Sequence, residues 1–214
     1  MRHRITLLLK TILDIIFPQA GIERDIANTS PETLIKKLSL DTHEKVHFLF
    51  RYKDPLIKQM IWRLKYKKDT HVAHLFAVLL HDTLLEELSD TQLFSGDTET
   101  VIVPIPLSKR RARERGYNQM KLVTNELLAL GGCAVDVDLL VKKRHTKPQT
   151  SLTHKSERVH NIKEAFAVTS KKDLKNTRIL LLDDVLTTGS TLAEAKKTLL
   201  QAGARSVSCI ALAH

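Results

Sequence analysis

The pattern of hydrophobic and polar positions changes near residue 100. Beyond it, short apolar runs alternate with amphipathic segments that end at glycines. The apolar runs predict buried strands at 101–103, 137–141, 165–168, 178–182 and 207–212. Segments 117–130 and 191–202 have the spacing of helices. Strands separated by helices predict an α/β fold, with a mostly parallel central sheet flanked by helices.

The first hundred residues are mostly helical in pattern. Helices are predicted at 5–16 and 72–88, and after the two cap residues Ser30 and Asp54, each followed by a proline. Residues 46–52 alternate like a strand. The polar stretch 89–100 predicts a loop, and we expect a boundary there.

One segment, Ile179 to Thr191, joins a buried strand to the start of a helix through two acids and a run of hydroxyls. Asp183 and Asp184 stand at the carboxyl end of the strand, where open α/β sheets bind ligands and where carboxylates can accept hydrogen bonds from sugar hydroxyls. Backbone N–H groups at a helix start attract phosphate, and Gly189 lets the backbone approach it. The hydroxyls that would add donors are those of Thr187, Thr188, Ser190 and Thr191. The segment therefore predicts a site for a phosphate and a ribose diol.

Two other interpretations of this segment are weaker. A helix-capping turn needs one acid and one hydroxyl, whereas here two acids and four hydroxyls surround one glycine. A nucleotide P-loop needs a lysine entering the helix, and no lysine occurs between Lys175 and Lys196. The sugar-phosphate site is the stronger hypothesis.

The positive charge of the chain is confined to one part of it. The net charge is 34 − 24 = +10, and residues 101–180 hold 17 basic and 7 acidic side chains, which is the whole excess. Residues 1–100 have 14 of each sign, and residues 181–214 have three of each. This distribution excludes a uniformly basic coat and indicates a local anionic partner. The plain alternative for any single cation is a solvated basic loop.

The composition, 43% hydrophobic and 27% charged, is typical of a globular protein. No apolar stretch approaches the ~20 residues of a membrane-spanning helix. Lys10 and Asp14 interrupt the apolar run near the N-terminus, so we expect an amphipathic helix there rather than a targeting signal. Contact of this helix with a membrane surface is a further alternative. Cys133 and Cys209 form no CxxC pair and favour a cytoplasmic location.

The Ile179–Thr191 segment is similar to the phosphoribosyl-pyrophosphate (PRPP) motif of type I phosphoribosyltransferases, and two further stretches narrow the resemblance to the ComF family. These are Val103-Pro104-Ile105-Pro106-Leu107 followed by Arg113-Glu114-Arg115-Gly116-Tyr117-Asn118-Gln119, and the series Arg144, Thr146, Gln149, Leu152, Arg158, Asn161, Ala165-Phe166. The specific match covers about 101–214. The resemblance implies a phosphoribosyltransferase-like domain over 46–214, with a hood from about 46–90, and an N-terminal helical extension over 1–45.

The resemblance also implies the roles of individual residues. Asp183, Asp184 and Arg144 would be catalytic, and the two acids with Thr187 to Thr191 would hold the ribose and 5-phosphate of PRPP. The pyrophosphate would lie on Pro106, Leu107, Ser108 and Lys109. The stretch 142–163 corresponds to a mobile loop that closes over PRPP. Mg²⁺ would bind through PRPP rather than in a protein metal cluster.

ComF relatives are associated with natural transformation, so the resemblance implies single-stranded DNA and the DNA-uptake machinery as partners. The expected DNA-binding cations are Arg110, Arg111, Arg113, Arg115, Lys143 and Lys147. Because Tyr117 and His145 are the nearby rings, we expect electrostatic contact rather than base stacking. Two alternatives stay open: an active phosphoribosyltransferase on an unidentified acceptor, and a PRPP-sensing regulator without turnover. The expected location is the cytoplasm, in contact with the inner face of the membrane.

The sequence departs from the family pattern near its N-terminus. The family often has a zinc-binding knuckle after a Phe-Pro pair. Phe17-Pro18 is present, but Ala20 and Glu23 stand where a CxxC pair would fall. We therefore expect no structural zinc in this chain.

Overall fold

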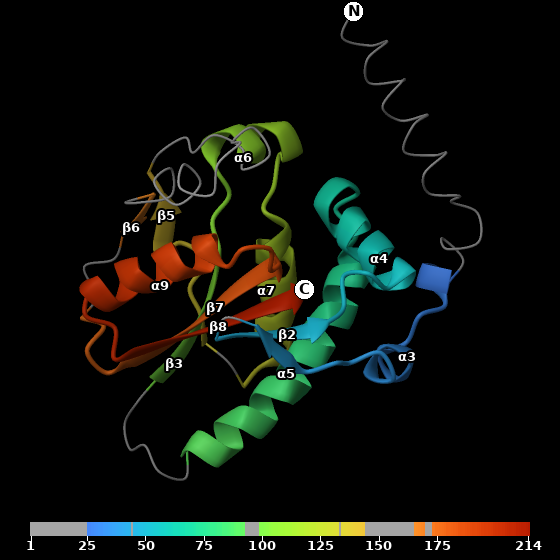
Figure 1. Cartoon of the computed structure of the whole chain (residues 1–214), viewed down its shortest axis with the longest axis horizontal. Helices are drawn as coiled ribbons and strands as arrows, with labels where there is room; N and C mark the ends of the chain where they lie inside the picture. Colours follow the sequence, from blue (N-terminus) through green and yellow to red (C-terminus); the bar gives the residue numbers. More distant parts are fainter. Residues whose placement is uncertain (1–24, 44, 93–98, 133, 144–164, 170–172) are drawn as a thin grey trace, which may run out of the picture.

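The computed structural model describes residues 25–43, 45–92, 99–132, 134–143, 165–169 and 173–214, with the backbone alone for 85–92 (Figure 1). Its elements, in chain order, are α3 (Pro31–Ile35), β1 (Asp41–His43), β2 (Val46–Phe50), α4 (Pro55–Tyr66), α5 (Thr70–Gln92), β3 (Glu99–Pro104), α6 (Lys109–Arg115), α7 (Gln119–Leu130), β4 (Ala134–Val135), β5 (Leu140–Lys142), β6 (Phe166–Val168), β7 (Thr177–Val185), α9 (Ser190–Gln201) and β8 (Ser206–Ala213). The predicted helix 5–16 and nearly all of the predicted mobile loop lie outside the described residues.

A six-stranded sheet with the order β1-β2-β8-β7-β3-β4 forms the centre of the molecule. Its strands pair in parallel except at β1, which is antiparallel to β2 at one edge. β5 and β6 form a separate antiparallel pair. The predicted α/β fold with a mostly parallel sheet is confirmed.

The strand β7 separates two hydrophobic cores. Leu180 and Leu182 pack into the core shared with α4, α5 and α7. Ile179 and Leu181 pack on the opposite face, in the core that includes residues of α9. Figure 1 shows α9 running alongside β7 and β8. Burial on both faces explains why the central strands have continuous apolar runs rather than alternation.

The basic stretch after β3 forms the helix α6. The hydroxyl of Ser108 accepts a hydrogen bond from the backbone N–H of Arg111 at 3.3 Å, which caps the start of α6. Gly116, with φ of 78°, ends the helix in the left-handed conformation that glycine tolerates. The cations of α6 therefore stand on a regular scaffold.

Two other predicted boundaries differ from the structure. The stretch 89–100 is not wholly a loop, because α5 continues to Gln92 and β3 begins at Glu99. The predicted strand 137–141 is replaced by β4 and β5. Between them Asp136 accepts hydrogen bonds from two backbone N–H groups that follow it, at 3.0 and 2.8 Å, and so forms a turn.

Candidate functional site

Both acids of the motif belong to β7, although the sequence placed them in a turn. The strand continues because Asp183 is paired with Ala211 of β8, and Val185 with Ala213. Successive strand residues point to opposite faces of a sheet. Asp183 therefore lies on the α9 face, and Asp184 lies on the face of α4 and α7. The structure separates two carboxylates that we expected to act side by side.

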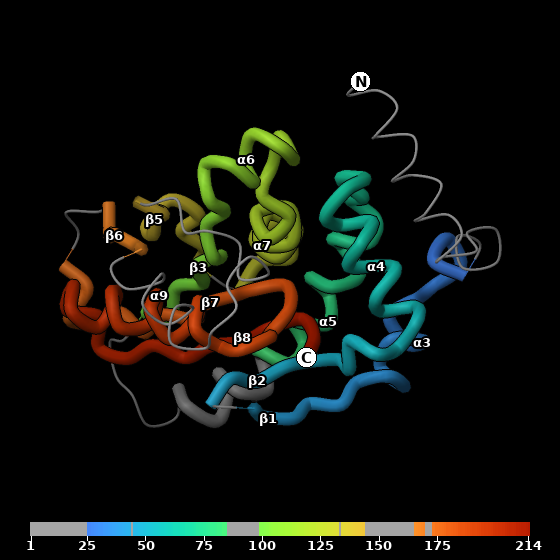
Figure 2. Tube along the Cα trace, turned by 45° about the horizontal axis from the view of Figure 1, so that its top comes forward, coloured from blue at the N-terminus to red at the C-terminus, as the bar shows by residue number. Residues whose placement is uncertain are grey.

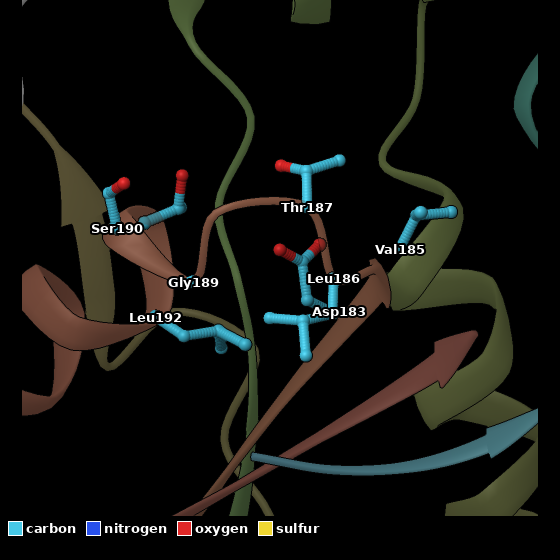
Figure 3. A pocket seen from close by; sticks show the side chains of 8 residues that line it. Asp183, Val185, Leu186, Thr187, Gly189, Ser190 and Leu192 are labelled. Atoms are coloured by element: carbon cyan, nitrogen blue, oxygen red, sulfur yellow. The ribbon is translucent and has the colours of Figure 1, made fainter. Parts of the chain in front are cut away.

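Asp183 lies at a pocket formed where β7 turns into α9. The other lining residues are Val185, Leu186, Thr187, Gly189, Ser190, Thr191 and Leu192. Figure 3 shows the Asp183 carboxylate directed toward the turn that carries Thr187. Gly189, with φ of 66°, precedes α9, and no side chain caps the helix start. Backbone N–H groups at the start of α9 are thus left for a ligand.

The predicted hydroxyls do not all line the pocket. Thr187, Ser190 and Thr191 do. Thr188 is not among the lining residues, and its hydroxyl oxygen lies 2.6 Å from that of Ser190. The pocket therefore presents three hydroxyls, the backbone N–H groups of the α9 start and one carboxylate.

The Asp183 carboxyl is electrostatically unusual. Burial raises its pKa to about 7, and the nearby charge of Asp184 adds to the rise. The backbone N–H of Asp184, 2.8 Å from Asp183 Oδ1, and the charges of Lys65 and Lys142 oppose it. A carboxyl that gains or loses its proton near neutral pH is typical of functional sites.

Asp184 is buried and already has partners. Its Oδ2 accepts a hydrogen bond from Gln119 Nε2 at 2.5 Å and lies 3.3 Å from Lys65 Nζ. Gln119 Oε1 in turn accepts a hydrogen bond from Arg115 Nη1 at 2.8 Å. Asp184 thus connects β7 to α7 and α4.

Neither Lys65 nor Gln119 was predicted as a site residue. Lys65 lies 184 − 65 = 119 positions before Asp184 in the chain. Gln119 lies 184 − 119 = 65 positions before it. No local spacing pattern reaches that far. The available signal was weak: Gln119 ends one of the stretches that resemble the ComF family, and Lys65 lies outside the specific match.

The loop predicted to hold pyrophosphate follows β3 at the same edge of the sheet as Asp183. β3 and β7 are adjacent, and the backbone N–H of Ile105 donates to the Leu182 carbonyl at 2.9 Å. Asn118 Nδ2 donates to the Ile105 carbonyl at 3.1 Å. The loop comprises Pro106, Leu107 and Ser108, and exposed Lys109 begins α6. These contacts place the loop beside the end of β7.

The predicted cations fall into two groups. Arg110, Arg111 and Arg113 are exposed on α6, and Arg110 pairs with Glu114 at 3.1 Å. Lys143 is exposed after β5. Arg115, at the end of α6, is partly buried and donates a hydrogen bond to Gln119. The other two predicted cations, Arg144 and Lys147, lie outside the described residues.

Lys142 of β5, which the sequence did not single out, interacts electrostatically with Asp183. Burial lowers the pKa of Lys142, the charge of Arg111 adds to the decrease, and Asp183 opposes it. Its Nζ lies 5.3 Å from the ring centroid of Phe166. A half-buried ammonium that interacts with Asp183 is a candidate contact for an anionic ligand.

No group of three or more His, Cys, Asp or Glu side chains among the described residues is placed to hold a metal ion. No helix in the described part of the chain is long and apolar enough to cross a membrane.

Comparison with known proteins defines the class of this fold and site. The sequence matches the Phosphoribosyl transferase domain family over residues 79–214. Competence protein F of Haemophilus influenzae is 31% identical over 172 residues, which are 80% of this chain and 73% of that protein. The DNA utilization protein YhgH of Salmonella typhimurium is 33% identical over 153 residues, 72% of this chain and 65% of that protein. The chain therefore belongs to the ComF family of phosphoribosyltransferase-fold proteins.

The chain is also similar to a further competence protein and, more weakly, to a solved phosphoribosyl transferase structure. Competence protein ComFC of Bacillus subtilis is 31% identical over 165 residues, 77% of this chain and 62% of that protein. The hypoxanthine-guanine phosphoribosyl transferase of Leishmania donovani overlays with a TM-score of 0.43 and 12% identity, over 66% of this chain and 67% of that one. The chain spans less than two thirds of the length of the Salmonella and Bacillus relatives.

Proposed function

We propose that this protein binds PRPP at the end of β7. The observation that carries the proposal is the pocket in which Asp183 faces hydroxyls and the uncapped start of α9. The 5-phosphate lies on Thr187, Ser190 and Thr191, and Asp183 accepts hydrogen bonds from the ribose. The pyrophosphate lies on the loop 106–109, which follows the neighbouring strand.

A Mg²⁺ ion fits this donor set only if it takes most of its oxygen ligands from PRPP. The described residues hold no cluster of three metal-binding side chains, and Asp183 supplies one carboxylate at the pocket. Mg²⁺ commonly binds through one or two carboxylates plus substrate phosphates. When bound, the ion would neutralise diphosphate charge.

The proposed biological role is DNA uptake. Two relatives carry the word competence in their names, and a third is called a DNA utilization protein. The exposed cations of α6 support contact with a nucleic-acid backbone, because in the described part of the chain most of them have no carboxylate at ion-pair distance. The DNA contact is single-stranded, as the handling of incoming DNA in transformation requires.

Transfer of the phosphoribosyl group to an unidentified acceptor is the second candidate function, and Lys142 favours it. Transfer breaks the bond between ribose C1 and the diphosphate and forms a bond from C1 to the acceptor. A fixed ammonium near Asp183 stabilises the departing diphosphate. A PRPP-sensing protein without turnover would need only the pocket.

Thermal unfolding tests PRPP binding. With Mg²⁺ and PRPP at 100 times Kd, we expect Tm to rise by about 5–10 °C, because the ligand stabilises the folded state alone. Asp183→Asn, alone or with Asp184→Asn, should abolish the shift. The matched control Asp173→Asn removes an exposed carboxylate outside the pocket and should keep the full shift. If Mg²⁺ and PRPP leave the Tm of the wild-type protein unchanged, the proposal is refuted.

A further inference from the structure

Two aromatic rings lie together on the solvent side of α4. Trp62 and Tyr66 are one helical turn apart, and their ring centroids are 5.7 Å apart with an interplanar angle of 45°. Tyr66 is 58% exposed, and Trp62 is partly exposed. Large exposed rings on one helix face offer apolar area that water solvates poorly.

Cations flank both rings. The guanidinium carbon of Arg115 lies 5.3 Å from the Tyr66 ring centroid, and Lys67 Nζ lies 5.6 Å from the Trp62 ring. Lys68, the next residue, is exposed. We call these five residues the ring surface. It combines π-faces with positive charge, which is the combination that single-stranded nucleic acids contact.

The ring surface is joined to α6 by a defined contact. Tyr117 Oη donates to the Leu64 carbonyl at 2.8 Å and accepts from the backbone N–H of Lys68 at 2.8 Å. Figure 2 shows α4 beside α7, with α6 above α7. These hydrogen bonds place the rings of α4 next to the Arg115 end of α6.

We propose that the ring surface stacks the exposed bases of single-stranded DNA, while the phosphates follow the cations of α6. The inference rests on the proposed DNA binding and adds base stacking, which we did not expect from the sequence because the rings lie about 50 positions before α6. Charge complementarity favours a polyanion, and the exposed ring area of Tyr66 favours unpaired bases. Duplex DNA keeps its base faces stacked and so cannot use the rings in this way.

Intrinsic fluorescence tests the inference directly, because Trp62 is the single tryptophan of the chain. In low salt, an unlabelled oligothymidylate should quench Trp62 emission, and the midpoint should agree with the Kd measured by anisotropy of a labelled copy. A blunt duplex of equal length should bind without quenching. Equal quenching by the duplex would overturn base stacking.

Substitutions separate stacking from charge. Tyr66→Ala should weaken oligothymidylate binding about tenfold, because it removes a ring on which a base stacks. The salt dependence of binding should stay unchanged, because no contact between a cation and a phosphate is removed. Tyr66→Phe should restore the affinity. Ile35→Ala, a 50% exposed apolar residue on α3, is the matched control and should have no effect. Circular dichroism checks that each variant is folded.

The failures of the two proposals are distinguishable. If oligothymidylate binds Tyr66→Ala at wild-type affinity and leaves Trp62 emission unchanged, the ring surface is overturned while DNA binding stands. If oligothymidylate does not bind the wild-type protein even in low salt, the proposed DNA role fails and the ring surface with it. Quenching by free thymidine alone, with no oligonucleotide binding, would also overturn the inference.

Discussion

The buried Asp183 side chain carries an electrostatic cost in the free protein. Its carboxyl is paired with no cation at ion-pair distance among the described residues, and burial disfavours its charged form. A ligand that brings hydroxyl donors, or a cation, would relieve this penalty. The side chain is therefore better suited to binding than to stabilising the fold.

The raised pKa of Asp183 predicts a specific pH dependence of stability. The unfolded carboxyl releases its proton near pH 4, whereas the folded one keeps it to about pH 7. Between these values the folded state binds the extra proton, so stability falls as pH rises and levels off above about 7. Asp183→Asn should remove this decline, which urea unfolding at several pH values would measure. Parallel curves for the two proteins would contradict the assignment.

At the scale of elements, the ion pair of Lys65 and Asp184 connects α4 to β7. The hydrogen bond from Gln119 connects α7 to the same carboxylate. The Lys65 side chain is 19% exposed and that of Asp184 is 10% exposed. Removing one member of such a pair leaves a poorly solvated charge. The two helices on this face are therefore held at the same strand end that supports the pocket.

A double-mutant cycle tests this connection. Lys65→Met should lower the free energy of unfolding by about 2–3 kcal/mol, somewhat less than for a fully buried pair. Adding Asp184→Asn should recover part of the loss, giving a coupling energy above about 1 kcal/mol. The exposed pair Lys175 and Asp173, 3.9 Å apart, is the matched control and should couple by less than about 0.5 kcal/mol. Urea denaturation measures both cycles. If the effects of Lys65→Met and Asp184→Asn on the free energy of unfolding are strictly additive, the two side chains do not interact.

For the whole molecule, folding redistributes the charge that the sequence confines to 101–180. Residues 63–68 carry four cations within a neutral half of the chain. Arg63 and Lys65 pair with Asp69 and Asp184, but Lys67 and Lys68 stay exposed beside Arg115. The basic surface therefore extends from α6 onto α4, which composition by segment did not show.

The salt dependence of DNA binding should report this surface. Arg111→Ala with Arg113→Ala should reduce the slope of log K against log salt by about 1.4, since each single-strand phosphate contact contributes about 0.7. Lys36→Ala with Lys197→Ala removes the same charge from α3 and α9 regions and should leave the slope unchanged. Anisotropy titrations with oligothymidylate over a salt series measure it. An unchanged slope in the α6 variant would show that α6 does not contact the DNA phosphates.

The sequence by itself determined the α/β class, the core of strand β7, the hydroxyl-rich turn after it and the ComF resemblance. Each depends on residues close in the chain, where hydrophobic period and helix-start chemistry act locally. Only the tertiary structure decided that Asp183 and Asp184 face opposite sides, that Gln119 meets Asp184 across 65 positions, and that Lys68 meets Tyr117 across 49. Such contacts form because sheet order and packing bring distant segments together, and no local pattern encodes that order.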